Sequence, residues 1–185
     1  MSIPTFTVYV GPMFSCKTTK LQLMLETFKY QRKKSITFKP KIDDRYSTSH
    51  IVSHGGWKTE AKIIEHGKDI MRYDVDKYDV IAVDEAFMIP GIADVLIDIY
   101  RRGYHVIVSS LDMSAKGVPF EEIYKIMMWA TSIEKCAAVC AVCGGNAHYS
   151  YLKIEDKIDE GQIKIGGADM YEPRCFIHHK DIISN

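Results

Sequence analysis

The sequence predicts an α/β fold with a mostly parallel sheet and a small metal-binding subdomain at its C-terminal end. Strand-like apolar runs alternate with segments of helical periodicity across residues 6–129. The run 80–83 is continuously apolar, which is typical of a strand that helices cover on both faces. From about Cys140 onward, cysteines, glycines and short polar segments replace this alternation. We therefore expect a core at residues 1–135 and an appended subdomain at 136–185.

The first elements surround a short loop. Residues 6–10 form an apolar run that predicts a strand, and the loop at 11–18 follows it. Apolar side chains then recur at helical spacing over residues 21–28. The basic trio at 32–34 ends this helix, where cations suit the negative end of the helix dipole.

Two strands are expected after this helix. Residues 35–39 form the first, which ends at Pro40. A polar loop around 43–47 comes next, and residues 61–64 predict a third short strand before a brief helix. This order continues the alternation of strands and helices.

The second half of the core repeats the pattern. The apolar run 80–83 is a strand, and residues 92–102 form an amphipathic helix that stops at Gly103. Residues 105–109 are the next strand, and 120–129 form a helix with one apolar face. Strands that are joined through helices in this way predict a parallel sheet.

Composition limits the class of protein. The 185 residues are enough for one domain with a small appendage, and 46% hydrophobic residues can build a core. The 24 basic and 24 acidic side chains cancel, which disfavours a nucleic-acid or membrane partner. No apolar run approaches the ~18 residues of a membrane span. Five cysteines without an export signal favour a reducing compartment, so we expect a soluble, cytoplasmic protein.

The loop at 11–18 is the most informative segment. A strand, a tight loop and a Lys-Thr pair that opens a helix together form the phosphate cradle of nucleotide-binding proteins. Backbone N–H groups wrap the polyphosphate, Lys17 reaches its end, and the Thr18 hydroxyl ligates Mg²⁺. Cys16 stands where the standard pattern has its second glycine, so the match is close and incomplete. The residues expected to bind ATP here are Gly11, Pro12, Met13, Phe14, Ser15, Cys16, Lys17, Thr18 and Thr19.

An acidic pair ends the central strand. Asp84 and Glu85 follow the run 80–83 directly. In phosphoryl transfer an aspartate in this place can hold Mg²⁺, and the next acid can act as a base near the γ-phosphate. Acids also occur at strand ends without such a role, but the upstream loop favours the catalytic interpretation.

Two short motifs predict a structural zinc site of the Cys₃His kind. They are spaced C-x-x-C and C-x-x-H, and their ligands are Cys140, Cys143, Cys175 and His178. His179 is a possible substitute for His178, and His148 is a more remote one. A redox-active cysteine pair is the competing interpretation, which the second motif disfavours. Cys136 has no spaced partner and is expected to be a buried thiol.

The segment between these motifs contains Gly166 and Gly167. Two glycines allow a backbone to approach a ligand closely, although they also occur in simple turns. A segment as long as 144–174 without clear structure of its own is usually functional or disordered. Metal ligands at both of its ends favour the functional interpretation.

In order and coverage, these motifs resemble the type II thymidine kinases, the compact, zinc-containing class of vertebrates, bacteria and DNA viruses. The matching segments span nearly the whole chain. They are Gly-Pro-Met-Phe-Ser with Lys17-Thr18, Asp43-x-Arg45-Tyr46-Ser47, Asp84-Glu85, Leu111-Asp112 with Pro119-Phe120, the cysteine motifs, and Ile165-Gly166-Gly167-Ala168-Asp169-x-Tyr171.

The resemblance implies a RecA-like phosphate-loop domain and a zinc-bound lasso that closes over the nucleoside. It also implies transfer of the ATP γ-phosphate to the 5′-hydroxyl of thymidine, giving dTMP for nucleotide salvage, with deoxyuridine as a further candidate. On this basis Glu85 accepts the hydroxyl proton, and Lys17 and Arg45 stabilise charge on the phosphoryl group. Thr18 serves Mg²⁺ together with Asp43 or Asp84.

The same resemblance implies an apolar slot for the base and a backbone strip that reads its polar edge. For each lining side chain, ordinary core packing is the alternative. The set expected to bind the substrate is Met13, Asp43, Met88, Leu111, Phe120, Ile163, Lys164, Ile165, Gly166, Gly167 and Tyr171. The family also implies homo-oligomers, commonly tetramers, and feedback binding of dTTP.

Some positions depart from the family pattern. Cys16 puts a side chain where a backbone approaches phosphate, residues 86–87 are Ala-Phe in place of Gly-Gln, and Ala115 replaces an aromatic residue. A nucleotide-binding protein that has lost catalysis is therefore one alternative, although retention of Glu85 and Arg45 argues against it. A zinc-containing nucleic-acid module is another, which the neutral charge disfavours.

Overall fold

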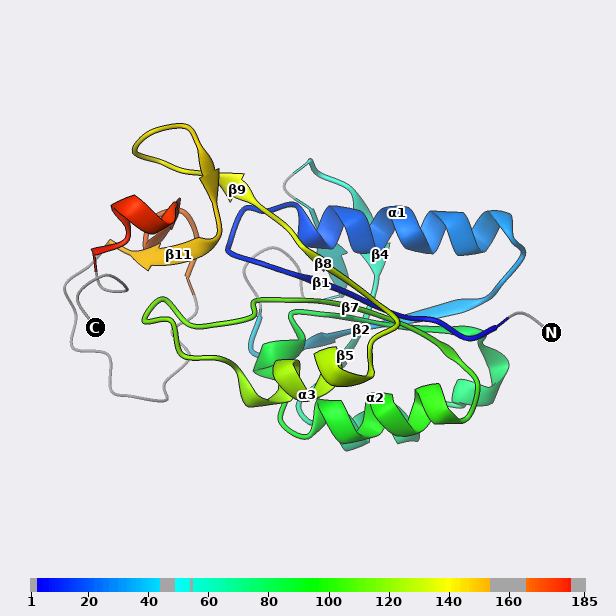
Figure 1. Ribbon diagram of the computed structural model, residues 1–185. Helices are drawn as coiled ribbons and strands as arrows, with labels where there is room; N and C mark the ends of the chain where they lie inside the picture. Colours follow the sequence, from blue (N-terminus) through cyan, green and yellow to red (C-terminus); the bar gives the residue numbers. More distant parts are fainter. Residues whose placement is uncertain (1–2, 44–48, 54, 154–165, 181–185) are drawn as a thin grey trace.

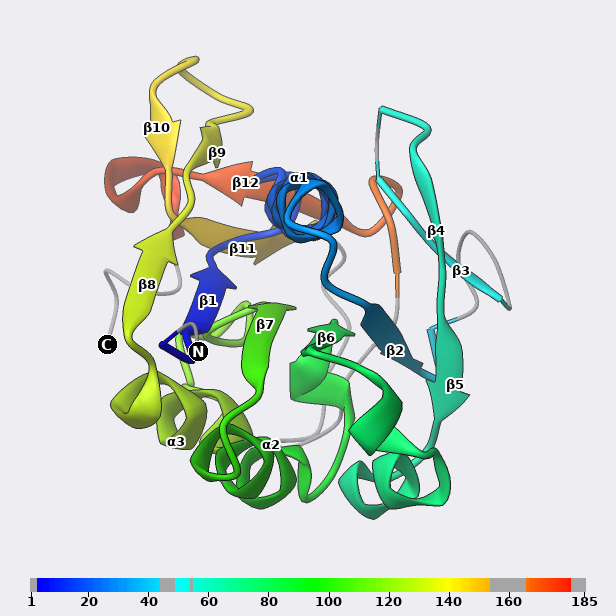
Figure 2. The same cartoon turned by 90° about the vertical axis from the view of Figure 1, so that its right-hand side faces the viewer.

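The computed structural model describes residues 3–43, 49–53, 55–153 and 166–180, and the structural statements below concern these residues. Its centre is a six-stranded sheet in the order β5-β2-β6-β7-β1-β8 (Figures 1 and 2). Every neighbouring pair in it is parallel. The strands are β1 (Phe6–Val10), β2 (Ser35–Pro40), β5 (Lys62–Ile64), β6 (Val80–Asp84), β7 (His105–Ser110) and β8 (Ser132–Lys135).

Helices cover both faces of the sheet. Helix α1 (Lys17–Tyr30) lies on one face, and α2 (Ile92–Arg101) and α3 (Glu121–Trp129) lie on the other (Figure 2). Strand β6 shows why its sequence is continuously apolar. Val80 and Ala82 belong to the core cluster under α1, while Ile81 and Val83 belong to the cluster under α2 and α3. Side chains alternate between faces along a strand, so each face of β6 requires its own apolar residues.

Smaller elements surround this core. Short 3₁₀ helices occur at η1 (Gly67–Arg72), η2 (Val75–Lys77) and η3 (Ala86–Met88). Strands β3 (His50–Val52) and β4 (Lys58–Glu60) form an antiparallel hairpin beside α1. The C-terminal part has two more antiparallel pairs and a last 3₁₀ turn: β9 (Ala138–Val139) with β10 (Asn146–Ala147), β11 (Tyr149–Leu152) with β12 (Tyr171–Arg174), and η4 (Phe176–His178).

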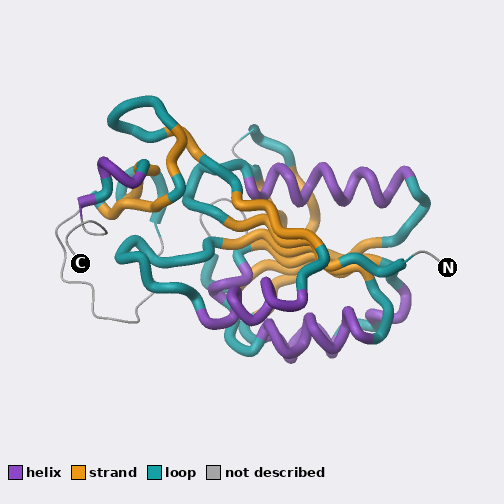
Figure 3. Tube along the Cα trace, in the orientation of Figure 1, coloured by secondary structure: helices purple, strands orange, loops and turns teal. Residues whose placement is uncertain are grey.

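The C-terminal lobe, residues 138–153 and 166–180, lies at the end of the sheet to which β1 points (Figures 1 and 3). The loop after β1 contacts it. Met13 N–H donates to Ser150 Oγ at 3.0 Å, and Phe14 packs against Ala138 and Cys140. The phosphate loop and the cysteine-containing lobe therefore meet, although they are far apart in sequence.

The expected α/β architecture with a parallel sheet is confirmed. The predicted strands and helices are all present, with ends shifted by one or two residues. The edge strand β8 was not predicted, because all four of its residues are exposed and only Ile133 is apolar. The β3–β4 hairpin was also missed. No helix in the described ranges is long and apolar enough to cross a membrane.

Candidate active site

The loop between β1 and α1 has a backbone that only certain residues tolerate. Gly11 has φ +142°, and a Cβ there would lie 2.3 Å from the carbonyl oxygen of Cys136. Phe14 and Cys16 have left-handed backbones, with φ 66° and 60°. Successive N–H groups in such turns converge on one side and form an anion-binding concavity. The loop is therefore shaped for phosphate.

Lys17 is buried at the start of α1. Its Nζ donates to the Pro12 carbonyl oxygen at 2.6 Å and lies 3.4 Å from Ser15 Oγ. Burial lowers the pKa of Lys17, and the nearby carboxylates of Glu85 and Asp84 oppose that shift. The ammonium group is thus positioned by the loop and faces two acids.

Asp84 is hydrogen-bonded and almost fully buried at the end of β6. Thr18 Oγ1 donates to its two carboxylate oxygens at 3.1 and 3.2 Å, and Ser109 Oγ donates to Oδ1. Burial, with a contribution from the charge of Glu85, raises the pKa of Asp84 to about 7. A threonine hydroxyl and an aspartate held together in this way form an oxygen donor set that suits Mg²⁺.

Glu85 has a left-handed backbone, with φ 51° and ψ 44°. A non-glycine residue in this conformation costs about 1–3 kcal/mol, and such strain concentrates at functional sites. The turn ends β6 and starts η3, and it places Glu85 among the residues that line the pocket at the phosphate loop. The strained backbone therefore serves to position a carboxylate at the site.

One pocket gathers most of the predicted residues. The predicted residues that line it are Met13, Phe14, Ser15, Cys16, Lys17, Thr18, Thr19, Asp43, Asp84, Glu85 and Leu111. Gly11 and Pro12 belong to the same loop and shape its backbone. The residues predicted to bind the polyphosphate and the predicted general base, Glu85, thus share one cavity.

Four further residues line this pocket that sequence reasoning missed. They are Lys39, Ile51, Val52 and Ser53. Lys39 Nζ lies 3.8 Å from Asp43 Oδ2, and both side chains are almost fully buried. A lysine inside the otherwise buried strand β2 was a signal for such a role, because an isolated buried ammonium is costly. The residues from β3 have no such sequence signal.

Other predicted substrate residues lie elsewhere in the described structure. Met88 is buried in the core, and Phe120 packs on Phe87 with ring centroids 4.6 Å apart. Tyr171 begins β12, and Gly167 accepts its backbone N–H at 3.0 Å in a turn that follows Gly166. None of these residues lines the pocket at the phosphate loop. Arg45, Ile163, Lys164 and Ile165 lie outside the described residues.

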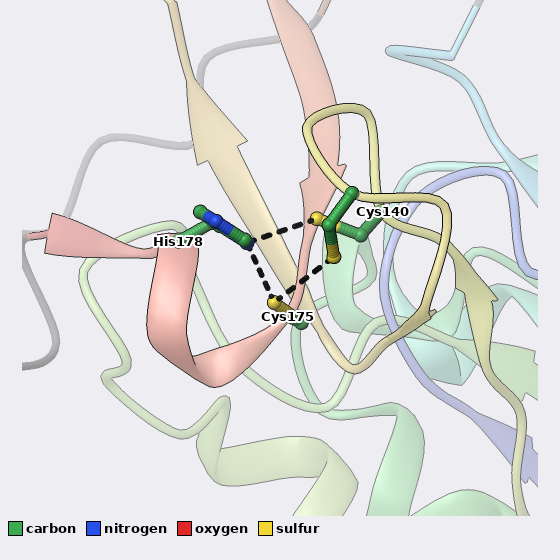
Figure 4. A group of neighbouring side chains, drawn as sticks. Cys140, Cys175 and His178 are labelled. Carbon is green, nitrogen blue, oxygen red and sulfur yellow. Dashed lines mark hydrogen bonds between the residues drawn. The ribbon is translucent and has the colours of Figure 1, made fainter.

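The predicted zinc ligands come together. The ligand atoms of Cys140, Cys143, Cys175 and His178 all lie within 4.8 Å of one another. Figure 4 shows Cys140, Cys175 and His178 facing a common centre. Two separations, Cys140 Sγ to His178 Nδ1 and Cys143 Sγ to Cys175 Sγ, are 3.8 Å. Tetrahedral ligands about 2.3 Å from one Zn²⁺ lie roughly 3.8 Å apart, which matches both separations. Cys175 Sγ and His178 Nδ1 are closer, at 3.0 Å, so these two ligands would have to move apart slightly to hold the metal.

Within the cluster the thiolate form is favoured at Cys140, while hydrogen bonding to Cys140 raises the pKa of Cys143. Desolvation acts to raise the pKa of Cys140, but backbone N–H groups of Cys175, Cys143 and Val142 outweigh it and bring the pKa down to about 6. Zinc binds the deprotonated form of cysteine. The local backbone therefore prepares this thiol for a metal.

The remaining candidates are not part of the cluster. His179 is completely buried, and its Nε2 lies 3.0 Å from the Ser150 carbonyl oxygen between two tyrosine rings. His148 is also outside the cluster, so His178 supplies the imidazole of the cluster. Cys136 is buried at the end of β8, as expected.

We expect Cys16→Gly to stabilise the protein by about 1 kcal/mol, because a left-handed backbone is strained for every residue except glycine. The free energy of unfolding in urea measures this effect. Cys16→Ser is the matched control, since it removes the thiol and keeps the strain, and it should leave the stability within about 0.5 kcal/mol. Equal stabilisation by both variants would show that the thiol and not the backbone was unfavourable.

Asp84→Asn should stabilise the protein more at high pH than at low pH. The pKa of Asp84 is raised on folding, so ionisation opposes folding as the pH rises from about 4 to about 7. In urea unfolding without Mg²⁺ or nucleotide, the advantage of the variant should grow by up to ~2 kcal/mol between pH 5.5 and pH 8. A constant difference across this range would contradict the raised pKa.

Comparisons with known proteins were made by sequence family and by structure. A family model described as thymidine kinase matches residues 4–179. Two solved structures of the genome packaging NTPase B204 from Sulfolobus turreted icosahedral virus 2 are also similar. The complex with ATP-γS is 17% identical, with 68% of this chain and 72% of that chain covered and a TM-score of 0.44. The complex with sulfate is 16% identical, with coverages of 66% and 71% and a TM-score of 0.43.

Proposed function

Because this chain belongs to the thymidine kinase family, we propose that it transfers the γ-phosphate of ATP to the 5′-hydroxyl of thymidine. One observation carries the proposal. A single pocket holds the phosphate loop, Lys17, Thr18 and the two acids that end β6. A protein that only binds nucleotide has no need for a strained glutamate beside the terminal phosphates.

The proposed chemistry assigns one task to each charged group. Loop N–H groups and Lys17 bind the polyphosphate and stabilise the charge that spreads over the transferring group. Thr18 and Asp84, with Asp43 nearby, would hold Mg²⁺, which neutralises phosphate charge when bound. Glu85 takes the proton of the 5′-hydroxyl as that oxygen bonds to the γ-phosphorus and the bond to the ADP oxygen breaks.

Lys39 extends this set. Its ammonium lies beside Asp43 in the same pocket and balances part of the local negative charge. We assign it a positioning role toward Asp43. Arg45, two residues further along the chain, is proposed to stabilise phosphoryl charge on the basis of the family motif.

The C-terminal lobe is proposed to complete the nucleoside site. Its contacts with Met13 and Phe14 connect it to the phosphate loop, and its Cys₃His cluster supplies a structural zinc site. We propose that the backbone at 163–167 and Tyr171 contact the base, together with Leu111 from the pocket. Met88 and Phe120 would contribute indirectly, because they pack around η3 and α3 and do not line the pocket.

The experiment that tests this function measures phosphate transfer from Mg-ATP in a zinc-loaded preparation. Thymidine, deoxyuridine, deoxycytidine and deoxyguanosine are compared as acceptors. We expect turnover that depends on thymidine, with deoxyuridine as the next best substrate. Stoichiometric ATP binding without turnover of any nucleoside would instead support a protein that has lost catalysis.

The family also motivates proposals about the whole protein. We propose a cytoplasmic homotetramer that binds dTTP as a feedback inhibitor and consists of a core at 1–135 and a subdomain at 136–185. Analytical ultracentrifugation at micromolar concentration tests the assembly. Competition of dTTP with thymidine in the kinase assay tests the inhibitor.

A further inference from the structure

A second groove lies between α1 and the β3–β4 hairpin, outside the phosphate-loop pocket. Helix α1, the start of β2, strand β4 and Tyr78 supply its walls. The hairpin stands beside α1 in Figure 2. We propose that this groove binds a nucleotide, a ligand with an aromatic base and a phosphate chain, at a site separate from the catalytic one.

Positive charge gathers around the groove. Lys29, Lys33, Lys34 and Lys58 line it, and Glu26 is the single acid among the lining residues. Lys29 Nζ is 3.3 Å from Glu26 Oε1, so that pair is largely neutral. Lys34 and Lys58 make no ion pair with any residue that the structure describes. In a chain with no net charge, this concentration of ammonium groups favours a polyphosphate ligand.

An aromatic surface accompanies these cations. Trp57, which directly precedes β4, is 52% exposed. Tyr78 lies half-buried in the same lining. Bases stack on exposed aromatic side chains, and each such stack contributes about 1–3 kcal/mol. The groove thus provides both parts of a nucleotide site, a stacking face and an ammonium rim.

The floor of the groove contains a polar group without a complete set of partners. Gln22 is 3% exposed, and its Nε2 lies 3.1 Å from the Trp57 carbonyl oxygen and 3.3 Å from Thr59 Oγ1. Its Oε1 accepts no hydrogen bond from the described part of the chain. Buried acceptors of this kind are rare in folded proteins.

The hairpin connects the groove with the catalytic pocket. Ile51, Val52 and Ser53 line the phosphate-loop pocket, whereas Trp57, Lys58 and Thr59 line the groove. Gln22 Nε2 also lies 3.4 Å from the Ile51 carbonyl oxygen, so one side chain contacts both sides of the hairpin. Residues of one hairpin therefore line both the groove and the phosphate-loop pocket.

The binding test uses fluorescence of Trp57, with ADP as the probe. The chain has two tryptophans, so Trp129→Phe leaves Trp57 as the only one. Adding Lys17→Ala weakens ADP binding at the phosphate loop. We expect ADP to quench Trp57 in this double variant with a saturable curve. No quenching would overturn the proposal, and because no turnover is measured, that failure leaves the proposed kinase activity untouched.

Charge reversal in the groove gives the matched comparison. Lys58→Glu and, separately, Lys34→Glu should weaken ADP binding at least tenfold in the same background. Lys68→Glu, an exposed lysine of η1, should leave it within twofold. Circular dichroism verifies that each variant is folded. If all three variants weaken ADP binding equally, the effect comes from the net charge of the protein and not from the groove, and the proposed site is wrong.

Two other probes distinguish the ligand class. Inorganic triphosphate should bind at least tenfold more weakly than ADP, because it lacks a base to stack on Trp57. Equal affinity would overturn the nucleotide assignment and leave a simple anion site. A ten-nucleotide thymidine oligomer that binds more tightly than ADP, with steep salt dependence, would replace the proposal with single-stranded nucleic acid.

Discussion

Glu85→Gln is expected to lower kcat for thymidine phosphorylation by about 10²–10⁴-fold, with KM for ATP changed by less than about threefold. Glutamine keeps the length of the side chain and tolerates the same backbone, but its amide does not accept the 5′-hydroxyl proton. Glu85 lines the same pocket as Lys17 and the other loop residues that are proposed to bind the polyphosphate. The loss therefore belongs to the chemical step and not to ATP binding. Initial rates at saturating Mg-ATP measure it.

The control for this prediction is Glu121→Gln. Glu121 is an exposed glutamate of α3 that pairs with Lys125 at 2.7 Å, away from the pocket. Glu121→Gln should keep kcat within twofold, because Glu121 does not line the pocket. The loss of its exposed ion pair should also leave the fold intact, since such pairs contribute little to stability. If Glu85→Gln retains wild-type kcat, Glu85 is not the base, and Asp84 becomes the carboxylate to examine.

Removal of zinc is expected to abolish thymidine phosphorylation and to unfold the C-terminal lobe while the parallel sheet stays folded. Structural zinc sites contribute on the order of 10 kcal/mol of apparent binding free energy, far more than the few short strands of this lobe can supply. Loss of the lobe also removes the contact between Ser150 and the N–H of Met13 in the phosphate loop. Cys175→Ser should reproduce the effect of a chelator.

Metal analysis and circular dichroism check this prediction together. Wild-type protein should contain one zinc per chain, and Cys175→Ser less than a tenth of that amount. The helical signal should remain, because α1, α2 and α3 lie outside the lobe. Cys16→Ser is the control, since Cys16 is an exposed thiol outside the Cys₃His cluster. Full zinc content in Cys175→Ser would show that this cysteine is not a ligand.

Local sequence patterns were sufficient to predict those features that are formed by residues close together in the chain. The segment from β1 through the phosphate loop to α1 is continuous, and its turn residues and apolar spacing are local properties. The zinc motifs are similar, because each C-x-x-C or C-x-x-H motif places two ligands on one short turn. The acidic pair at the end of β6 was also predicted, since the residues that follow a parallel strand lie at the carboxyl end of the sheet.

The missed features depend on partners that are distant in the chain. Strand β8 is a strand because its backbone pairs with β1, about 125 residues earlier, as in the pair Thr7 and Ser132. Its exposed residues have no apolar alternation that could indicate this pairing. Lys39 acquires a role only because β2 brings it to the phosphate-loop pocket beside Asp43.

The sequence by itself determined the fold class, the phosphate loop, the acid pair and the three cysteines of the candidate zinc site, because each depends on residue type and short spacing. The tertiary structure alone decided the strand order, the position of the hairpin against α1 and the choice of His178 over His179. Both histidines fit the spacing, but His179 turns into the core between Tyr149 and Tyr151. Which histidine joins the cluster is decided by tertiary packing, because burial and strand pairing depend on contacts between residues that are far apart in the sequence.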